Sequence, residues 1–419
     1  MTGGRTLLMA IDGIDGPDLE RLRRSVLPEG IAPSGRLRVL PGGPSEAYPS
    51  LVSVCTGTSA GRSGVATDAA FDPGSPSAGL HWYADSLRVP TVFDAAADAG
   101  MTTAALQWPA TAGSGIDLCL PLVEDLRRYR ERWTMARETS SAAMWERHLR
   151  PRQEAGVHLS SAPPDALVAE IAAEVLADGR IDLMAVRLAA FADAQRRSGP
   201  DSPAARRALG DLADRLQQIL EAFSPGAEDR VILLPGRPCV PVRALVHPNA
   251  ALVAAGLVRT DGPHVTDWDA FVMPDGPYAA LHVDRSAPAG TAARALEALA
   301  GLAAEHGLCL REVDDGIGAT PQTDVVAVLE GHRGTVFGQA ATQRARIAGE
   351  DPYYSGPLAV TDPDAEVTAC ATGPGLPADD SAGSWADLGV SIARSMGLAL
   401  PGATARGLQD RAAAAADGP

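Results

Sequence analysis

The chain has 419 residues, which is enough for one large domain with an insertion or for two domains. Hydrophobic residues make up 46% of the chain and aromatic residues only 4%, so the core must be aliphatic and rich in alanine. The net charge of −16 repels phosphate backbones, and we therefore expect no nucleic-acid partner.

Cysteine usage and the N-terminus indicate the compartment. There are five cysteines, an odd number, without the CxxC or Cys/His spacing of a disulfide framework or a zinc finger. The apolar run after Arg5 is too short for a secretory signal, and no run reaches the ~18 apolar residues that cross a membrane. We therefore expect a cytoplasmic protein with no membrane partner.

Taken in chain order, the sequence predicts strands that alternate with helices. Residues 5–12 form a buried strand that ends in an acid, a helix covers 16–30, and 50–57 are apolar enough for a buried helix. Helix–glycine–strand units follow at 91–109, 164–189 and 204–236, and a strand at 324–331 precedes a closing helix at 383–402. This alternation predicts an α/β fold whose parallel strands hold the ligand at their carboxyl ends.

Two segments interrupt the alternation. Residues 121–165 are charged and rich in Trp and Arg, and we expect them to form a helical excursion near the pocket. Residues 250–320 combine a strand-like stretch, a helix and a further strand, which predicts a small α+β cap inserted between core segments 1–249 and 321–412.

Several stretches resemble one known family in order and spacing. They include "LLMAIDG" at 7–13, "AYPSLVSVCTGTSAGRSGV" at 47–65, "AAFADAQRRSGPDS" at 189–202, "VILLPGRPCVPVRALVHPN" at 231–249 and "YYSGPLAV" at 353–360. On these stretches the chain resembles the type I phosphodiesterase/nucleotide pyrophosphatase family of the alkaline phosphatase superfamily, including its phosphonoacetate hydrolase-like members. The resemblance implies a parallel sheet flanked by helices on both faces.

The same resemblance implies a site with two divalent metals, usually zinc, held by three Asp and three His. Position by position, this sequence keeps one ligand and changes the others, so that the site is degenerate. The matching positions are Asp12 for the retained aspartate, Ala47 for the nucleophile, Asp68 for a helper Asn, Ala192 and Arg196 for an Asp and a His, Gly236 and Arg237 for an Asp–His pair, and Ser355 for the last His. A slip of one residue would bring Asp193 into the slot of Ala192.

Two of the lost histidines are replaced by arginine, which binds carboxylate or phosphate through two parallel hydrogen bonds. We therefore expect a metal-free and cofactor-free anion pocket lined by Arg196, Arg237, Asp12 and either Asp68 or Asp193. In that pocket Asp12, charge-compensated by the two arginines, would act as a general base, and arginine would stabilise an oxyanion.

Further residues are expected to contact the substrate. We expect Ala47, Tyr48, Ser355 and His332 at the substrate-binding surface. Each signal also has a structural interpretation: Asp12 could cap the following helix, and Arg196 could lie in solvent. His332 follows a strand in "LEGHRG", where the family carries a comparable segment that does not bind metal.

Two functions of different class remain open. The first is a repurposed, metal-independent enzyme that acts on an anionic small molecule by acid–base, elimination, isomerisation, cyclisation or acyl chemistry, as in specialised metabolism. The second is an inactive relative that binds a phosphorylated or carboxylated ligand or scaffolds a partner. Ordinary two-metal phosphodiester hydrolysis is the least favoured, because its metal ligands and nucleophile are changed. A homo-oligomer is compatible with either function.

Overall fold

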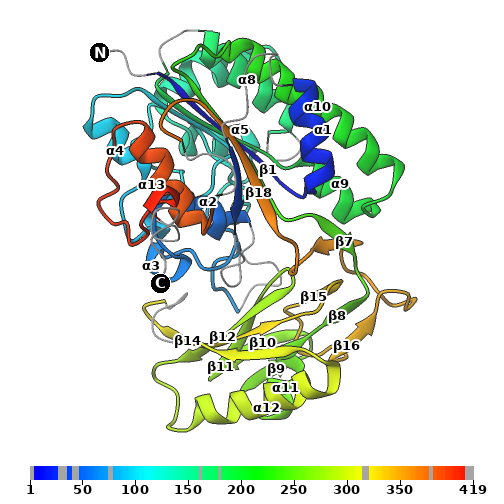
Figure 1. The fold of residues 1–419 in the computed structure, drawn as a ribbon. Helices are drawn as coiled ribbons and strands as arrows, with labels where there is room; N and C mark the ends of the chain where they lie inside the picture. Colours follow the sequence, from blue (N-terminus) through cyan, green and yellow to red (C-terminus); the bar gives the residue numbers. More distant parts are fainter. Residues whose placement is uncertain are drawn as a thin grey trace.

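The computed structural model describes residues 4–26, 35–39, 47–73, 79–159, 163–177, 181–313, 320–376 and 381–410. Its larger part is an eight-stranded sheet in the order β19-β2-β18-β6-β1-β5-β3-β4 (Figure 1). These strands are β1 (Thr6–Ile11), β2 (Gly35–Val39), β3 (Thr103–Leu106), β4 (Leu118–Leu120), β5 (Leu183–Leu188), β6 (Arg230–Pro235), β18 (Val367–Thr372) and β19 (Ala382–Gly383).

The centre of this sheet is parallel, as the sequence predicts. Strands β6, β1, β5, β3 and β4 all run in the same direction. Strand β18 runs antiparallel to both of its neighbours, β6 and β2. The fold is therefore α/β with a mostly parallel sheet, and the antiparallel β18 is the one departure that the sequence pattern did not indicate.

Alternation along β1 explains why helices cover both faces of the sheet. Leu7, Met9 and Ile11 pack into one buried cluster with helices α1 (Gly16–Val26), α8 (Asp165–Ala177) and α10 (Pro203–Phe223). Leu8 and Ala10 pack into a second cluster with α2 (Ala47–Thr56), α4 (Val92–Asp98) and α13 (Trp385–Ser395). A strand that is apolar on both sides is typical of a parallel sheet buried between two helical layers.

The excursion expected at 121–165 is helical. It contains α5 (Arg132–Thr139), α6 (Ala142–Met144), a π-helix (Trp145–Leu149) and α7 (Arg150–Glu154). Trp133 and Trp145 meet edge to face at 6.3 Å within the cluster that contains α8. The described residues of this segment pack on the core, and none of them lines the pocket at the strand ends.

A smaller unit lies below the large sheet, and we call it the cap, from β8 to β16 (Figure 1). Its centre is an antiparallel sheet in the order β11-β12-β14-β13, covered by α11 and α12, beside a β9–β10 hairpin and a three-stranded sheet β15-β8-β16. The bounds are β8 (Ala244–Val246), α11 (Pro248–Ala254), β9 (Val258–Asp261), β10 (His264–Trp268), β11 (Ala270–Asp275), β12 (Tyr278–Asp284), α12 (Thr291–His306), β13 (Cys309–Glu312), β14 (Thr323–Glu330), β15 (Thr335–Phe337) and β16 (Arg346–Ala348).

The cap draws on chain beyond the expected 250–320, because β8 precedes that range and β14 follows it. Residues 314–319 of that range lie outside the described residues. Between core and cap lie α9 (Ala190–Ser198) and the antiparallel pair of β7 (Cys239–Pro241) and β17 (Ala359–Thr361). Short helices α3 (Ala60–Ser63) and a 3-10 turn (Ala84–Ser86) follow α2. Among the described residues, no helix combines the length and apolarity needed to cross a membrane.

Helix α2 is held in place by a close approach to α13. A methyl group at Gly389 of α13 would lie 2.0 Å from the carbonyl oxygen of Val54 on α2, so only glycine fits there. The N-terminus of α13 is fixed by a capping box, in which Ser384 and Asp387 bond each other's backbone N–H groups. Because α2 begins at Ala47, this contact also positions the first turn of α2.

We expect Gly389→Ala to lower the free energy of unfolding by about 1–3 kcal/mol or more, because backbone must move to admit the methyl group. The matched control is Gly301→Ala, at an exposed position of α12 where nothing lies within 4 Å of the added methyl group. That change should stabilise the protein by about 0.5–1 kcal/mol, since alanine favours helix. Urea unfolding of both variants checks this, and equal midpoints would contradict the close contact.

Candidate functional site

A pocket opens at the carboxyl ends of the central strands, and we call it the strand-end pocket. It is narrow, with a volume of about 30 Å³. Residues from four parts of the fold line it: the ends of β1 and β6, the first turn of α2, α9, and the β17–α13 region. They are Ala10, Asp12, Gly13, Ala47, Ser50, Leu51, Arg196, Leu234, Pro235, Gly236, Arg237, Thr361 and Trp385.

The structure thus brings together four of the residues that the sequence singles out. Asp12, Ala47, Arg196 and Arg237 all line the strand-end pocket. They come from separate elements. They meet because β1 and β6 are neighbours in the sheet and α2 and α9 lie over the ends of these strands. This agrees with the expectation that the site lies at the carboxyl edge of the parallel sheet.

Asp12 is paired with Arg187, a residue that no motif in the sequence marks. Both of its carboxylate oxygens accept hydrogen bonds from Arg187, at 3.1 and 3.3 Å from Nε and at 2.5 Å from Nη2. The Arg187 and Asp12 side chains are only 7% and 6% exposed. The expected compensation of Asp12 by Arg196 and Arg237 is therefore corrected: the ion pair is made by Arg187, which enters from the neighbouring strand β5.

Strand alternation explains the position of Arg187. It follows Leu183 and Ala185 at intervals of two residues, and these pack on the α2 side of the sheet. Burial opposes the charge of this guanidinium, but the hydrogen-bonded carboxylate of Asp12, with a smaller effect from Asp68, more than offsets burial and raises the pKa of Arg187. The side chain is therefore a permanent buried cation below the strand-end pocket.

Tyr48 lies beside this cation and is fully buried. The Arg187 guanidinium carbon is 5.1 Å from the centre of the Tyr48 ring, within reach of a cation–π interaction. Among the described residues, neither the Tyr48 hydroxyl nor Arg187 Nη1 has a hydrogen-bond partner. Burial also raises the pKa of Tyr48, so its hydroxyl stays protonated. Tyr48 supports the site from below and does not line the pocket.

Asp68 has the most perturbed carboxyl group near the site. Its Oδ1 accepts a hydrogen bond of 2.8 Å from the backbone N–H of Tyr48, next to Ala47. Burial raises the pKa of Asp68 to about 6, against the opposing effects of Arg187, the Tyr48 N–H and Arg196. The backbone N–H of Asp68 in turn donates to both oxygens of Asp275 in the cap, at 3.2 and 3.3 Å. A carboxyl that titrates near neutrality suits proton transfer.

Arg237 is oriented by the cap. Its Nη1 donates to the hydroxyl of Tyr278 on β12 and to the carbonyl oxygen of Pro363 at 3.1 Å. Its guanidinium carbon also lies 5.6 Å from the centre of the Tyr278 ring. The cap therefore fixes one of the two arginines that line the strand-end pocket.

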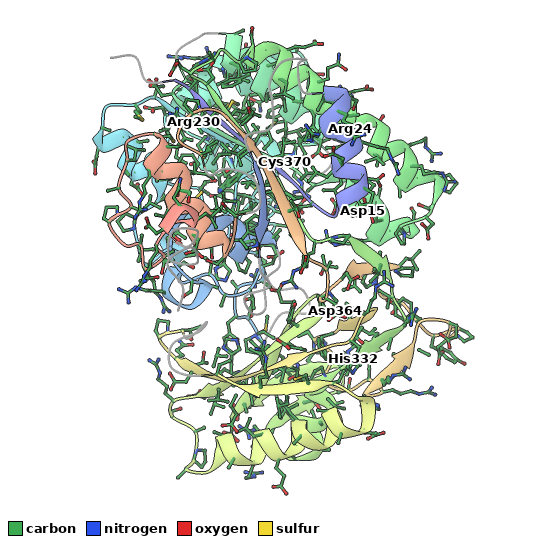
Figure 2. All side chains as sticks on the ribbon, viewed as in Figure 1. Asp15, Arg24, Arg230, His332, Asp364 and Cys370 are labelled. Atoms are coloured by element: carbon green, nitrogen blue, oxygen red, sulfur yellow. The ribbon has the colours of Figure 1, made fainter. Side chains whose placement is uncertain are left out.

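Three other predicted site residues lie elsewhere. Asp193 is 48% exposed on α9 and makes a 3.5 Å contact with Arg196. Ser355 is exposed in the loop before β17. His332 lies in the cap just after β14 (Figure 2), and its side chain is exposed. None of the three lines the strand-end pocket, and neither does Asp68, so the pocket contains neither of the two carboxylates expected beside Asp12.

The residues present do not fit the two-metal site that the family resemblance implies. Among the described residues, no group of three His, Cys, Asp or Glu side chains could hold a metal ion. A Cβ at Gly236 would lie 3.1 Å from the Gly13 nitrogen, so the backbone leaves little room for a carboxylate there. Ala192 is fully buried in a small apolar cluster with Cys239 and Ala359. Two lost ligand positions are thus filled by packing.

The sequence does contain one indication that Arg187 is a buried charge. In the buried strand run "LMAVRL", residues 183–188, one charged side chain interrupts an apolar segment. Such a residue needs a buried partner, and Asp12 directly follows the adjacent strand β1. Ser50 and Trp385 also line the pocket. A helical turn separates Ser50 from Ala47, but no pattern pointed to Trp385.

Comparisons with known proteins agree with this geometry. The sequence model of the type I phosphodiesterase / nucleotide pyrophosphatase family matches residues 6–306. Human ectonucleotide pyrophosphatase / phosphodiesterase 5 is similar in structure, with 14% identity and a TM-score of 0.58 over 96% of this chain and 97% of that one.

Two structures of the murine ectonucleotide pyrophosphatase / phosphodiesterase 5 are similar to the same extent. One is an inactive threonine-to-alanine variant in complex with AMP, and both show 14% identity and a TM-score of 0.57 over 96% of this chain and 97% of theirs. At this identity the likeness shows the fold alone. No curated protein matches the chain in sequence.

We expect Asp12→Asn to destabilise the protein by about 3–5 kcal/mol, because it leaves the Arg187 guanidinium buried without a counter-charge. The double variant Asp12→Asn/Arg187→Met should recover much of this loss. The control is Asp15→Asn, a nearby exposed position where asparagine keeps the oxygen that accepts the Asp18 N–H. Thermal unfolding measures all three, and an Asp12→Asn variant as stable as Asp15→Asn would disprove the role of the pair.

Because the pKa of Asp68 is raised, we expect the free energy of unfolding to depend on pH. Because its pKa in the folded protein is raised to about 6, the fold favours the protonated form, and stability from this group falls as pH rises from about 4 to 6. Asp68→Asn should therefore stabilise the protein above pH 7, on the order of 1–2 kcal/mol given partial exposure, and much less at pH 4.

Melting temperatures across pH 4–8 check the Asp68 prediction. Asp98→Asn, at an exposed position of α4, serves as the control and should show no such trend. A difference between Asp68→Asn and the wild type that is constant with pH would show that Asp68 does not titrate as expected.

Proposed function

Because the chain belongs to the type I phosphodiesterase / nucleotide pyrophosphatase family of the alkaline phosphatase superfamily, we propose that it acts on a small anionic molecule held at the strand-end pocket by arginine. The observation that carries this proposal is the convergence of Arg196, Arg237 and Asp12 on one pocket beside Ala47. These side chains come from three elements that are distant in the sequence. A scaffold alone would not need them to meet.

The two guanidiniums determine the class of ligand. Each presents a planar set of N–H donors that matches a carboxylate or a phosphate group. The pocket is narrow, so it suits the anionic group of a ligand better than a whole molecule. The arginines would hold this charge by hydrogen bonds from fixed positions, with the Tyr278 hydroxyl and the Pro363 carbonyl orienting Arg237.

The proposed chemistry is metal-independent acid–base catalysis, such as elimination, isomerisation, cyclisation or acyl chemistry. With alanine at position 47, no hydroxyl stands where the family resemblance places the nucleophile. Asp12, the base expected from the sequence, has both oxygens engaged by Arg187. Asp68 does not line the strand-end pocket, but its pKa of about 6 makes it the better suited group to exchange a proton near neutral pH, from its position beside the first turn of α2. Arg196 or Arg237 would stabilise the oxyanion that forms.

A second function has its own support. The Asp12–Arg187 ion pair and the packed Ala192 make the strand ends rigid, which also suits a protein that binds an anion without converting it. Opposed charges in one pocket favour the enzyme. The location proposed for either function is the cytoplasm, in line with the cysteines, of which Cys55, Cys119, Cys239 and Cys370 are buried thiols.

We expect wild-type protein to bind inorganic phosphate or oxalate saturably, and Arg237→Ala or Arg196→Ala to weaken this binding at least tenfold. Arg197→Ala is the matched control, because Arg197 is exposed on the same helix as Arg196 and does not line the pocket. Isothermal titration calorimetry gives the affinities, and elemental analysis of the purified protein gives its metal content. Binding unaffected by Arg237→Ala, or stoichiometric zinc, would defeat the proposal.

A further inference from the structure

A second and larger cavity lies between the core and the cap. Its volume is about 290 Å³, just below the lower end of the range of small-molecule sites, against about 30 Å³ for the strand-end pocket. On the core side it is lined by the segment after α3, and on the cap side by β12 and β14. We call it the core–cap cavity and define it by Phe71, His81, Tyr278, Ala280, His282 and Val328.

The cap side of this cavity is built by strand alternation. Tyr278, Ala280 and His282 are separated by two residues along β12, so their side chains share one face of the sheet. Leu281 points to the opposite face and packs in the apolar core of the cap. The sheet therefore presents an aromatic ring, a methyl group and an imidazole to the cavity, with the methyl group of Ala280 leaving space between the two rings.

Aromatic rings form one wall. Phe71 stacks on His282 with ring centroids 4.2 Å apart and an angle of 30°. The same phenyl ring meets Trp268 edge to face at 5.2 Å and Phe271 at 6.5 Å, which fixes its orientation. Preformed and rigid rings of this kind bind a further aromatic ring at little entropic cost.

His81 supplies a hydrogen-bonding atom that is not used within the described structure. Its Nδ1 is buried and has no hydrogen-bond partner there. The residue is held by its backbone, because its N–H donates to the Asp68 carbonyl at 3.0 Å and its carbonyl accepts from Ala110 at 3.0 Å. A buried ring nitrogen without a partner is costly. Because the imidazole lines the cavity, a ligand that turns the ring so that this nitrogen faces the cavity and bonds it would remove that cost.

The charges around the cavity disfavour an anion. Burial lowers the pKa of His81 to about 4 and that of His282 to about 3, so both imidazoles are neutral at pH 7. Three charged side chains also line the cavity: Asp275, which accepts the Asp68 N–H, and the exposed Asp85 and Arg88. Two carboxylates against one guanidinium leave no excess positive charge for a negative group. Val328 and Ala280 add apolar surface.

We propose that the core–cap cavity binds an uncharged aromatic ring with one hydrogen-bonding atom, placed against the Phe71–His282 stack and Tyr278 with that atom at His81. This site is distinct from the strand-end pocket, and it does not depend on the anion proposal. The two sites meet at Tyr278, whose ring lines the cavity and whose hydroxyl accepts a hydrogen bond from Arg237.

Indole tests this site, with 5-fluoroindole as the probe for fluorine NMR and 1-methylindole as the analogue without an N–H. We expect saturable binding of 5-fluoroindole by the full chain with a Kd of roughly 0.1–1 mM, as for a ligand of about ten heavy atoms. Ala280→Phe fills the cavity and should weaken binding at least tenfold. Ala293→Phe, the same substitution at an exposed position of α12, should leave it within about twofold.

His81→Ala keeps the test decisive if Ala280→Phe fails to fold. It should weaken binding of 5-fluoroindole about fivefold or more and leave 1-methylindole unchanged, because only the N–H can bond the imidazole. No saturable binding by the wild type, or equal binding by Ala280→Phe and Ala293→Phe, would overturn the proposal. Phosphate affinity measured on the same samples keeps the two sites apart, since loss of phosphate binding alone bears only on the strand-end pocket.

Discussion

The strand ends of this protein are organised around one buried ion pair. Arg187 cannot give up its proton and is almost wholly removed from water, so it requires a carboxylate at contact distance. Asp12, at the end of the neighbouring strand, meets that requirement. This pairing gives Asp12 a structural role that does not involve a metal. Its charge serves an internal cation that belongs to the chain.

The same pair fixes what surrounds it. Tyr48 lies against the guanidinium, and Asp68 accepts the N–H of Tyr48, so that the first turn of α2 is tied to the ion pair. The backbone N–H of Asp68 donates in turn to Asp275 in the cap, and the hydroxyl of Tyr278, also in the cap, accepts a hydrogen bond from Arg237. Core and cap thus share polar contacts at the pocket, and side chains from both determine its shape.

Much of the fold could be predicted from the sequence because its signals are local. Residues 5–12 and 229–236 are apolar on both faces, and glycines separate helices from strands, which gives a buried parallel sheet. The antiparallel β18 and the extent of the cap could not be read in this way, because pairing between distant strands leaves no local pattern. The family model matches residues 6–306, and the structural neighbours agree with the fold.

The site was predictable only in part. Asp12, Arg196 and Arg237 were found because a family pattern marks their positions, and the structure brings them to one pocket. Arg187 matches no motif, and its role follows from the cost of burying a charge. For His332 and Ser355, sequence order indicated a position near the pocket, but both side chains are exposed and neither lines it. Trp385 lines the pocket because of tertiary packing, which no local sequence pattern indicates.

Gly236 has a consequence for the history of the molecule. The backbone at the end of β6 lies so close to the end of β1 that its N–H bonds the Ile11 carbonyl at 2.6 Å and a side chain would crowd Gly13. An ancestor with an aspartate at that position would have needed a wider gap between the two strands. A Cβ at 3.1 Å from the Gly13 nitrogen requires the neighbouring backbone to move by a few tenths of an ångström, so an aspartate at position 236 would have to displace the end of β1 as well.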